Sequence, residues 1–308
     1  MEKVTYLDNI GCVRLFNGTV EVVVTVDVGP RIIRYGFPGG ENILGELPEV
    51  SIETALGDWK PWGGHRLWTA PEANPRSYVP DNSPLEYSSD NGQTIHLIQP
   101  VERATGIQKE MTVLLDAEGS GLTVEHKITN RNLWAIEAAP WAITTMNGGG
   151  TAILPQEPYR SWEEYLLPAR PMVLWHYTDL SDPRWKIGAK YIRLRTDERL
   201  KQPQKIGIMN KQGWAGYHRR GLLFLKHAAF EEGARYPDYG SSTEIYTSGS
   251  TIEVETLSPL RHLEPDAAAV HVERWKLFRD VEIGLTEAEI EKVIDALIEQ
   301  IEMPDCNR

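Results

Sequence analysis

Residues 19–37 read TVEVVVTVDVGPRIIRYGF, and this stretch decides the fold class. The segment 19–27 is rich in β-branched residues, and its apolar positions run on with little interruption, which is typical of a buried strand. Gly29 and Pro30 then mark a turn, and the segment 31–37 has the composition of a second strand. The start of the chain therefore predicts two strands joined by a short turn.

Short strands separated by Gly, Pro, Asn and Asp are expected along most of the remaining chain. The segments with this pattern are 94–99, 108–115, 122–129, 133–146 (with a break at Pro140), 191–196, 205–209, 221–227, 243–247, 251–257 and 269–278. The stretch 155–185 is instead rich in Pro, Trp and Tyr, and we expect a long excursion with little regular structure there. Strands without alternating helices predict an all-β fold. At 308 residues, one large antiparallel β-sandwich is favoured over a small barrel.

One helix is expected, close to the end of the sequence. Thr286 and Glu289 have the spacing of a capping box, in which the two side chains satisfy free amide groups at a helix start. An apolar stripe at helical spacing follows, formed by Ile290, Val293, Ile294, Leu297, Ile298 and Ile301. We therefore expect a β-sandwich domain over residues 1–283 and an amphipathic helical segment over 284–308 that packs on it.

Composition and charge limit the partners. A formal net charge of −12 argues against nucleic acid and anionic membranes, because both require a basic surface. The first residues lack the basic-then-apolar order of a signal peptide, and no apolar run reaches the ~20 residues that span a bilayer. The two cysteines show no disulfide pattern. These features predict a cytoplasmic protein, and they leave its oligomeric state open.

Motifs for metals and common cofactors are absent from the sequence. The eight histidines are scattered without the spacing of a zinc site, and no cysteine pair has metal-ligand spacing. The sequence has no nucleophile elbow, and the glycines at 148–150 lack the lysine and helix of a phosphate-binding loop. We therefore expect neither a metal nor a cofactor.

The segment 62–72, WGGHRLWTAPE, combines two indoles with charged groups. The glycine pair and Pro71 predict a loop here. One interpretation is structural, with Trp62 and Trp68 covering the end of the core and the side chains between them in solvent. The other is a sugar platform, because flat rings stack on sugars while polar groups bind hydroxyls. Ten Trp and 12 Tyr against five Phe favour such half-apolar, half-wet sites.

Carboxylates share one face of the strand TIEVETL, residues 251–257. Side chains alternate along a strand, so Glu253 and Glu255 point to the same side. In STEIYT, residues 242–247, Glu244 lies on one face with a serine and a tyrosine, and the turn before it carries Asp238. These residues belong either to an ordinary solvent-facing pair of strands or to a polar cleft. Because like charges so close disfavour double ionisation, one of Glu253 and Glu255 should titrate high unless Arg66 or Arg31 lies between them.

Several of these motifs together resemble galactose mutarotase-like proteins. The resemblance covers roughly residues 5–280 in element order and rests on VGPRII after the first strands, a following NIL, the late VETLSP and the closing HVERWKLF. The segments WGGHRLWTAPE and YPDYGSSTEIYT look most similar to one branch of these proteins. The resemblance implies a β-supersandwich with a sugar site on the concave face of one sheet.

The resemblance also implies catalytic roles. In aldose 1-epimerases a strand glutamate takes the proton of the anomeric hydroxyl and a histidine protonates the ring oxygen; Glu255 in ETL matches the glutamate. At the usual position of the histidine this chain has Arg131 or Trp141, depending on register, and neither can serve as an acid near neutral pH. His65 is the counterpart of a second family histidine in an early loop, and it becomes the candidate acid.

Two function classes remain open at this stage. The first is an enzyme acting at the anomeric carbon of a sugar or sugar derivative, and the second is a carbohydrate-binding protein without catalysis; a lyase or hydrolase has no signature. The catalytic candidates are Glu255 and His65, on the expectation that the segment 62–72 folds over the face that carries Glu255. The candidate substrate-binding residues are Arg31, Trp62, Arg66, Trp68, Asp238, Glu244 and Glu253.

Overall fold

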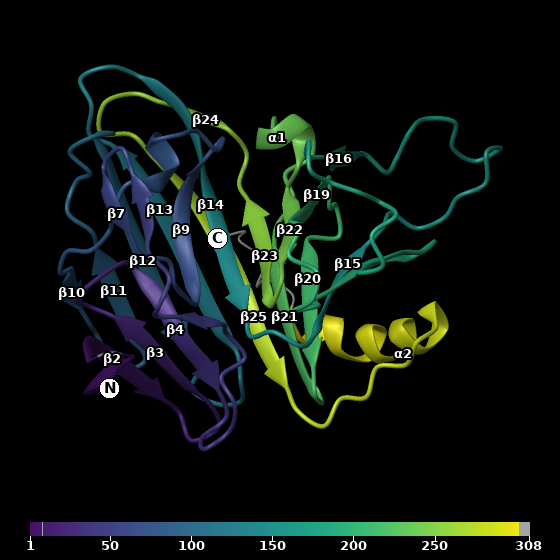
Figure 1. Ribbon diagram of the computed structural model, residues 1–308, viewed down its shortest axis with the longest axis horizontal. Helices are drawn as coiled ribbons and strands as arrows, with labels where there is room; N and C mark the ends of the chain where they lie inside the picture. The colour runs from purple at the N-terminus through teal and green to yellow at the C-terminus, as the bar shows by residue number, and fades with distance from the viewer. Residues whose placement is uncertain (8, 302–308) are drawn as a thin grey trace.

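The computed structural model describes residues 1–7 and 9–301, and its regular structure consists mainly of antiparallel strands in two large sheets (Figure 1). The first sheet has the order β1-β2-β3-β4-β9-β14-β23-β22-β19-β16, with β24 paired to β14. Its strands are β1 (Glu2–Tyr6), β2 (Ile10–Phe16), β3 (Glu21–Thr25), β4 (Arg31–Gly36), β9 (His65–Ala70), β14 (Ile136–Met146), β16 (Met172–Leu174), β19 (Gln204–Ile208), β22 (Thr243–Ser248), β23 (Thr251–Leu257) and β24 (Arg261–Leu263).

The second sheet has the order β10-β11-β12-β13-β25-β21-β20-β15-β18-β17. Its strands are β10 (Glu86–Ser88), β11 (Thr94–Ile98), β12 (Ile107–Leu115), β13 (Leu122–Asn130), β15 (Thr151–Pro155), β17 (Trp185–Ile187), β18 (Tyr191–Arg195), β20 (Trp214–Arg219), β21 (Leu222–Ala228) and β25 (Ala268–Phe278). Two small ribbons pair β5 (Glu46–Leu47) with β8 (Trp62–Gly63) and β6 (Ile52–Thr54) with β7 (Gly57–Trp59). The short helical turns are η1 (Arg76–Tyr78), α1 (Pro237–Gly240) and η2 (Glu299–Ile301).

The main core lies between the two large sheets. The β-branched run of β3 supplies Val22 and Val24, which are fully buried there. Across the interface, Tyr35 of β4 packs its ring 6.0 Å from that of Trp275 in β25. Burial of apolar surface on this scale dominates the stability of such a fold. The predicted all-β antiparallel sandwich is confirmed.

The terminal helix α2 (Glu287–Ile298) begins as predicted. Thr286 and Glu289 form a capping box with both reciprocal hydrogen bonds. Ile290, Ile294 and Ile301 are buried against the side of the second sheet that faces away from the first, beside Trp214. Residues 302–308 of the predicted helical segment lie outside the described residues. Within the part of the chain that the structure describes, no helix is long and apolar enough to cross a membrane.

The prediction of a loop over 62–72 is wrong. β9 (His65–Ala70) is a central strand of the first sheet, paired with β14 and, at its start, with β4. Gly63 and Gly64 interrupt the chain only before this strand, with φ of 89° and 65°. A Cβ at Gly64 would lie 2.2 Å from the carbonyl oxygen of Ile32, so the glycine permits the close approach to β4. Because polar and aromatic residues occupy both faces of this strand, its sequence does not show the apolar–polar alternation that is typical of a strand.

Candidate functional site

The candidate site lies on the outer face of the first sheet, the face turned away from the second sheet. In the register of β14 with its neighbours, Ile143 lies opposite both Arg66 of β9 and Glu255 of β23. Trp141, two residues before Ile143, lies opposite Trp68 of β9, and Thr145, two residues after Ile143, lies opposite Glu253 of β23. The alternation of side chains therefore brings an arginine, two carboxylates and two indoles to one surface.

A cavity of about 550 Å³ opens on this surface, and we call it the outer cavity. Its aromatic lining consists of Trp59, Trp68, Tyr78, Trp141, Trp175, Tyr177 and Tyr246. The ring of Trp68 is central, 5.5 Å from that of Trp141, 5.2 Å from Trp59 and 5.0 Å from Tyr78 between ring centroids. Charged side chains complete the lining, namely Arg66, Glu72, Lys205 and Glu253.

Arg66 and Glu253 form a charged pair beside the indoles. Arg66 Nη1 lies 3.0 Å from Glu253 Oε1, and the Thr145 hydroxyl donates to the same oxygen at 3.0 Å. The Arg66 guanidinium also lies 4.8 Å from the ring centre of Trp68. Arg66 thus compensates the charge of Glu253, which weakens the repulsion between Glu253 and Glu255. The pair also holds the guanidinium beside the flat apolar surface of Trp68.

Glu255 lies beneath the outer cavity and is not part of its lining. Its Oε2 accepts hydrogen bonds from Trp141 Nε1 at 2.8 Å and from Lys205 Nζ at 3.0 Å. Its Oε1 is buried and has no hydrogen-bond partner among the described residues. Burial raises the pKa of Glu255, although the ammonium of Lys205 opposes that shift.

Lys205 of β19 holds two carboxylates together. Its Nζ lies 2.7 Å from Glu244 Oε2 and 3.0 Å from Glu255 Oε2. The same atom lies 4.7 Å and 4.8 Å from the ring centres of Trp141 and Trp175. Burial alone would lower the pKa of Lys205, but the two carboxylates outweigh it and hold that pKa well above its ordinary value. The lysine is therefore a fixed cation below the cavity.

Glu244 and Asp238 add acidic groups around this lysine. Glu244 lies directly opposite Glu255 in the pairing of β22 with β23, and it is fully buried. Burial raises the pKa of Glu244 well above its ordinary value, with Lys205 opposing and the other carboxylates reinforcing the shift. Burial also raises the pKa of Asp238, which lies in the turn α1 with a φ of 47°. Burial therefore makes these carboxyls bind a proton more readily than exposed carboxyls do.

Four of the predicted binding residues lie outside the cavity lining: Glu244 and Asp238, which surround Lys205, and also Arg31 and Trp62. Arg31 shares the outer face with Arg66 but is fully buried, and its Nη2 lies 2.6 Å from Asp81 Oδ2. Trp62 packs into a separate apolar cluster with Val23, Ile33 and their neighbours, and Lys60 lies over its ring. The structural interpretation of Trp62 therefore fits its surroundings better than a sugar platform does.

His65 faces the opposite way from Glu255, so the expected pairing of these two residues is wrong. The side chain of His65 points between the sheets, where Nε2 lies 2.6 Å from His126 Nε2 and Nδ1 lies 2.9 Å from the Thr144 hydroxyl. It is fully buried, and burial lowers its pKa well below the ordinary value. His65 and Arg66 are adjacent on the strand, so their side chains point to opposite faces of the sheet, and that of His65 points toward the core.

The surroundings of His65 form a buried polar network, which we call the inter-sheet cluster: His65, His126, His271, Lys226, Thr144, Thr256 and Glu273. Ligand atoms of His65, His126 and Glu273 lie within 4.8 Å of one another, close enough to suggest a metal site. However, Lys226 Nζ lies 2.7 Å from Glu273 Oε1, and Trp275 Nε1 donates to Oε2 at 2.9 Å. A divalent ion would add charge to a buried group that is already neutral and hydrogen-bonded, so a structural role fits better.

This cluster predicts a loss of stability in mild acid. Burial lowers the pKa of His65 and His126, and lowers that of His271 to about 3. In the unfolded chain each histidine binds a proton below about pH 6.5, whereas the folded protein keeps it neutral, so stability falls as the pH falls through that value. Between pH 7 and pH 5.5 we expect a loss of about 1 kcal/mol per histidine, measured by urea unfolding.

A paired comparison isolates the histidines from other acid effects. His271→Gln removes one buried titrating group, and the pH dependence should shrink by about a third, one histidine of the three. His262→Gln changes a side chain that is 66% exposed and should leave the pH dependence unchanged. Equal slopes in both variants would contradict the assignment.

Comparisons with known proteins agree on the architecture. No protein-family model matches the chain, and no curated protein matches it. Among solved structures, a putative aldose 1-epimerase from Klebsiella pneumoniae superposes with a TM-score of 0.61 at 10% identity, covering 96% of this chain and 85% of the other. A galactose mutarotase-like protein from Lactobacillus casei gives 0.56 at 11% identity, covering 87% and 100%. The chain has the galactose mutarotase-like fold.

A third similar structure belongs to a larger protein. A TPR-domain containing protein from Parabacteroides distasonis superposes with a TM-score of 0.62 at 14% identity. The match covers 97% of this chain but only 50% of that protein, so this chain spans half of its length. At such identities the likeness shows the mutarotase-like fold alone, and the chemistry has to be argued from the residues.

Proposed function

We propose that the protein binds a sugar in the outer cavity. The observation that carries the proposal is the composition of the lining, in which seven aromatic side chains surround a space of about 550 Å³. Indole and phenol rings present flat apolar faces, which suit the C–H surfaces of a sugar ring. A few convergent polar groups in a largely apolar cavity are typical of small-molecule sites.

The charged residues of the lining suit the hydroxyls of such a ligand. Arg66 donates from a guanidinium that Glu253 and two indole faces hold in place. Glu72 and Glu253 supply acceptor oxygens, and Lys205 supplies a donor at the floor. Donors and acceptors on either side of flat rings let one cavity fix both the plane and the rotation of a sugar. The names of the superposed structures, which include putative aldose 1-epimerases, support the same ligand class.

A second candidate function is ring opening at the anomeric carbon. The observation that favours it is the unpartnered Oε1 of Glu255, on a carboxyl whose pKa is raised by burial. In this reaction Glu255 takes the proton of the anomeric hydroxyl, and the carboxyl of Glu244, in the protonated form that burial favours, gives a proton to the ring oxygen. Reclosure of the open aldehyde returns both protons.

The geometry ranks this reaction behind binding. Neither Glu244 nor Glu255 lines the outer cavity, because Trp141 and Lys205 lie above them. For a sugar to reach Glu255, the Lys205 side chain has to leave its position between the two carboxylates. Breaking this ion pair costs free energy, and while it is intact the lysine lowers the basicity of Glu255. The aromatic lining therefore supports sugar binding more strongly than the carboxylates support ring opening.

Trp175→Ala should weaken sugar binding about 10- to 100-fold, because it removes a half-buried indole from the edge of the cavity. Trp175 is preferable to Trp68 for this test, since Trp68 also packs in an apolar cluster beneath the cavity. The affinity is measured by calorimetry over a panel of monosaccharides. Trp134→Ala is the matched control, because that indole is 64% exposed and lies outside the cavity. Equal affinity in the two variants would refute the assignment.

A further inference from the structure

The excursion predicted over 155–185 contains a protruding segment, residues 156–171, which we call the arm. It joins β15 to β16 and reaches away from both sheets (Figure 1). Its large apolar side chains are exposed rather than packed on the body: Tyr159 83%, Trp162 72%, Leu166 80% and Leu167 68%. Such a concentration on one segment is unusual for the surface of a monomer and marks an interaction site.

The arm is fastened to the body only at its base. Gln156 donates its backbone N–H to the Lys190 carbonyl, and Gln212 Nε2 donates to the Gln156 carbonyl. The bonds farther out are internal, from the N–H groups of Glu164 and Tyr165 to Ser161. Over the described residues, no hydrogen bond joins residues 158–169 to either sheet. The arm is thus a separate projection with free apolar surface.

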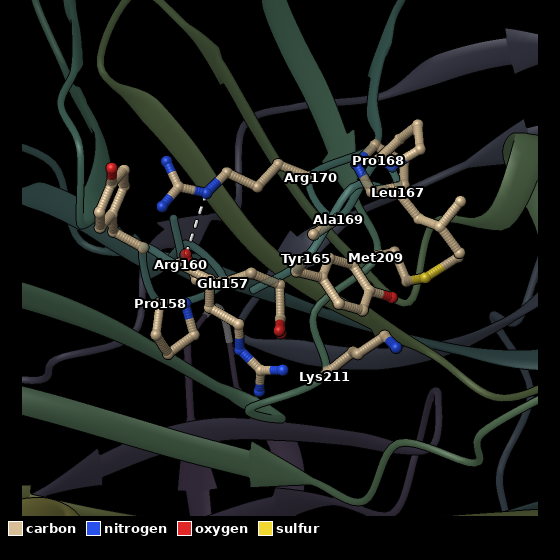
Figure 2. A pocket seen from close by; sticks show the side chains of 12 residues that line it. Glu157, Pro158, Arg160, Tyr165, Leu167, Pro168, Ala169, Arg170, Met209 and Lys211 are labelled. Carbon is tan, nitrogen blue, oxygen red and sulfur yellow. Dashed lines mark hydrogen bonds between the residues drawn. The ribbon is translucent and has the colours of Figure 1, made fainter. Parts of the chain in front are cut away.

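A pocket of about 430 Å³ lies between the limbs of the arm and the chain after β19 (Figure 2). Tyr165 and Leu167 of the arm line it, and Met209 and Lys211 close it from the body. The pocket shares no lining residue with the outer cavity. The arm therefore presents both protruding side chains and a recess large enough for an indole.

The arm also carries charges of both signs that form no ion pair among the described residues, although Arg170 donates to the Glu157 carbonyl and Arg160 lies over the ring of Tyr165. Arg160 and Arg170 line the pocket, and neither forms an ion pair among the described residues. The arm also carries Glu163 and Glu164, which likewise form no ion pair in that part of the structure. In a twofold contact the same patch lies on both sides, so it must be complementary to itself in shape and charge. The arm carries protruding side chains beside a pocket and charges of both signs, which are the features that such a self-complementary contact requires.

We propose that the arm is the interface of a twofold dimer of this chain, with Trp162 of each copy seated in the arm pocket of the other. In that arrangement the arginines of one arm face the glutamates of its partner. The area also fits, because Tyr159 and Trp162 can bury about 150–250 Å² each. Leu166 and Leu167 add to this area and bring it toward the roughly 800 Å² per copy of a standard interface.

The test is the mass of the full chain in solution, by sedimentation velocity at about 1–100 μM. The wild type should sediment as a dimer, and Trp162→Ser combined with Leu166→Ser should raise the dissociation constant at least 100-fold. The matched control is Leu133→Ser with Trp134→Ser, which removes an equally exposed apolar pair, 90% and 64%, from another turn. This control should remain a dimer.

A charge exchange separates an interface effect from a folding effect. Arg160→Glu should weaken the dimer, and adding Glu163→Arg should restore it. In the double variant the charges at positions 160 and 163 are exchanged, so each still faces the opposite charge on the partner arm. At concentrations below the dissociation constant of the wild-type dimer, melting temperatures should match the wild type in every variant. A monomeric wild type, a control that dissociates as readily as the arm variant, or a monomer that instead captures a different macromolecule through the arm would each overturn the proposal.

Discussion

Lys205→Met should lower the free energy of unfolding by about 3–5 kcal/mol, which is the expected cost of leaving buried charges without their partner. Glu244 and Glu255 are 0% and 1% exposed, and Lys205 is the cation within 3.0 Å of both. Without it, the carboxylates must either remain charged in an apolar setting or take up protons. The loss should therefore grow as the pH rises above neutrality. Urea unfolding at pH 6 and pH 8 measures both effects.

Two further variants define what this loss means. Lys211→Met removes a surface lysine paired with Glu232 at 2.8 Å, and it should change the free energy of unfolding little, because exposed ion pairs contribute little to stability. Combining Lys205→Met with Glu244→Gln and Glu255→Gln removes all three charges and should recover much of the lost stability. If Lys205→Met costs no more than Lys211→Met, the buried ion triad is not a stabilising element of this fold.

Glu255→Gln should abolish most of any mutarotation, by ~10²–10⁴-fold, because the amide keeps the shape of the side chain but cannot accept the anomeric proton. Sugar affinity should change little, since Glu255 lies below the cavity and not in its lining. Polarimetry on free aldoses measures the rate, and calorimetry measures the affinity. Glu125→Gln, at an exposed position of β13, is the control for the effect of losing a carboxylate.

The outcomes of this experiment separate the two candidate functions. A large fall in rate with retained affinity would establish ring opening with Glu255 as the base. Sugar binding without any rate enhancement in the wild type would leave only the binding function. A rate that is the same in wild type and Glu255→Gln would show that another group removes the proton, and it would end the catalytic assignment of this residue.

Much of the fold could be predicted because its signals are local. The β-branched run at 19–27 contains β3, and the capping box at Thr286 marks the start of α2. Alternation in TIEVETL correctly placed Glu253 and Glu255 on one face of β23. Each of these features depends on residues within one strand or one helical turn, and such features can be read without knowing the tertiary contacts.

The site was harder to predict because its contacts join distant segments. Lys205 lies 50 residues from Glu255, and an isolated lysine in an expected strand looks like an ordinary solvent-facing residue. Trp175 likewise comes from the irregular excursion, where no periodicity indicates its direction. The glycine pair before His65 favours a loop in the sequence, and a loop gives no indication of which way the His65 side chain points. Neighbouring His65 and Arg66 in fact serve opposite faces of the first sheet.

The central claim, a sugar in the outer cavity, is tested most directly by a crystal structure of the protein soaked in a mixture of monosaccharides. We expect density for one sugar ring against the indoles of Trp68 and Trp141, with hydroxyls bound by Arg66 and Glu253. A cavity that stays empty at saturating sugar, or a sugar bound on another surface of the molecule, would contradict the account.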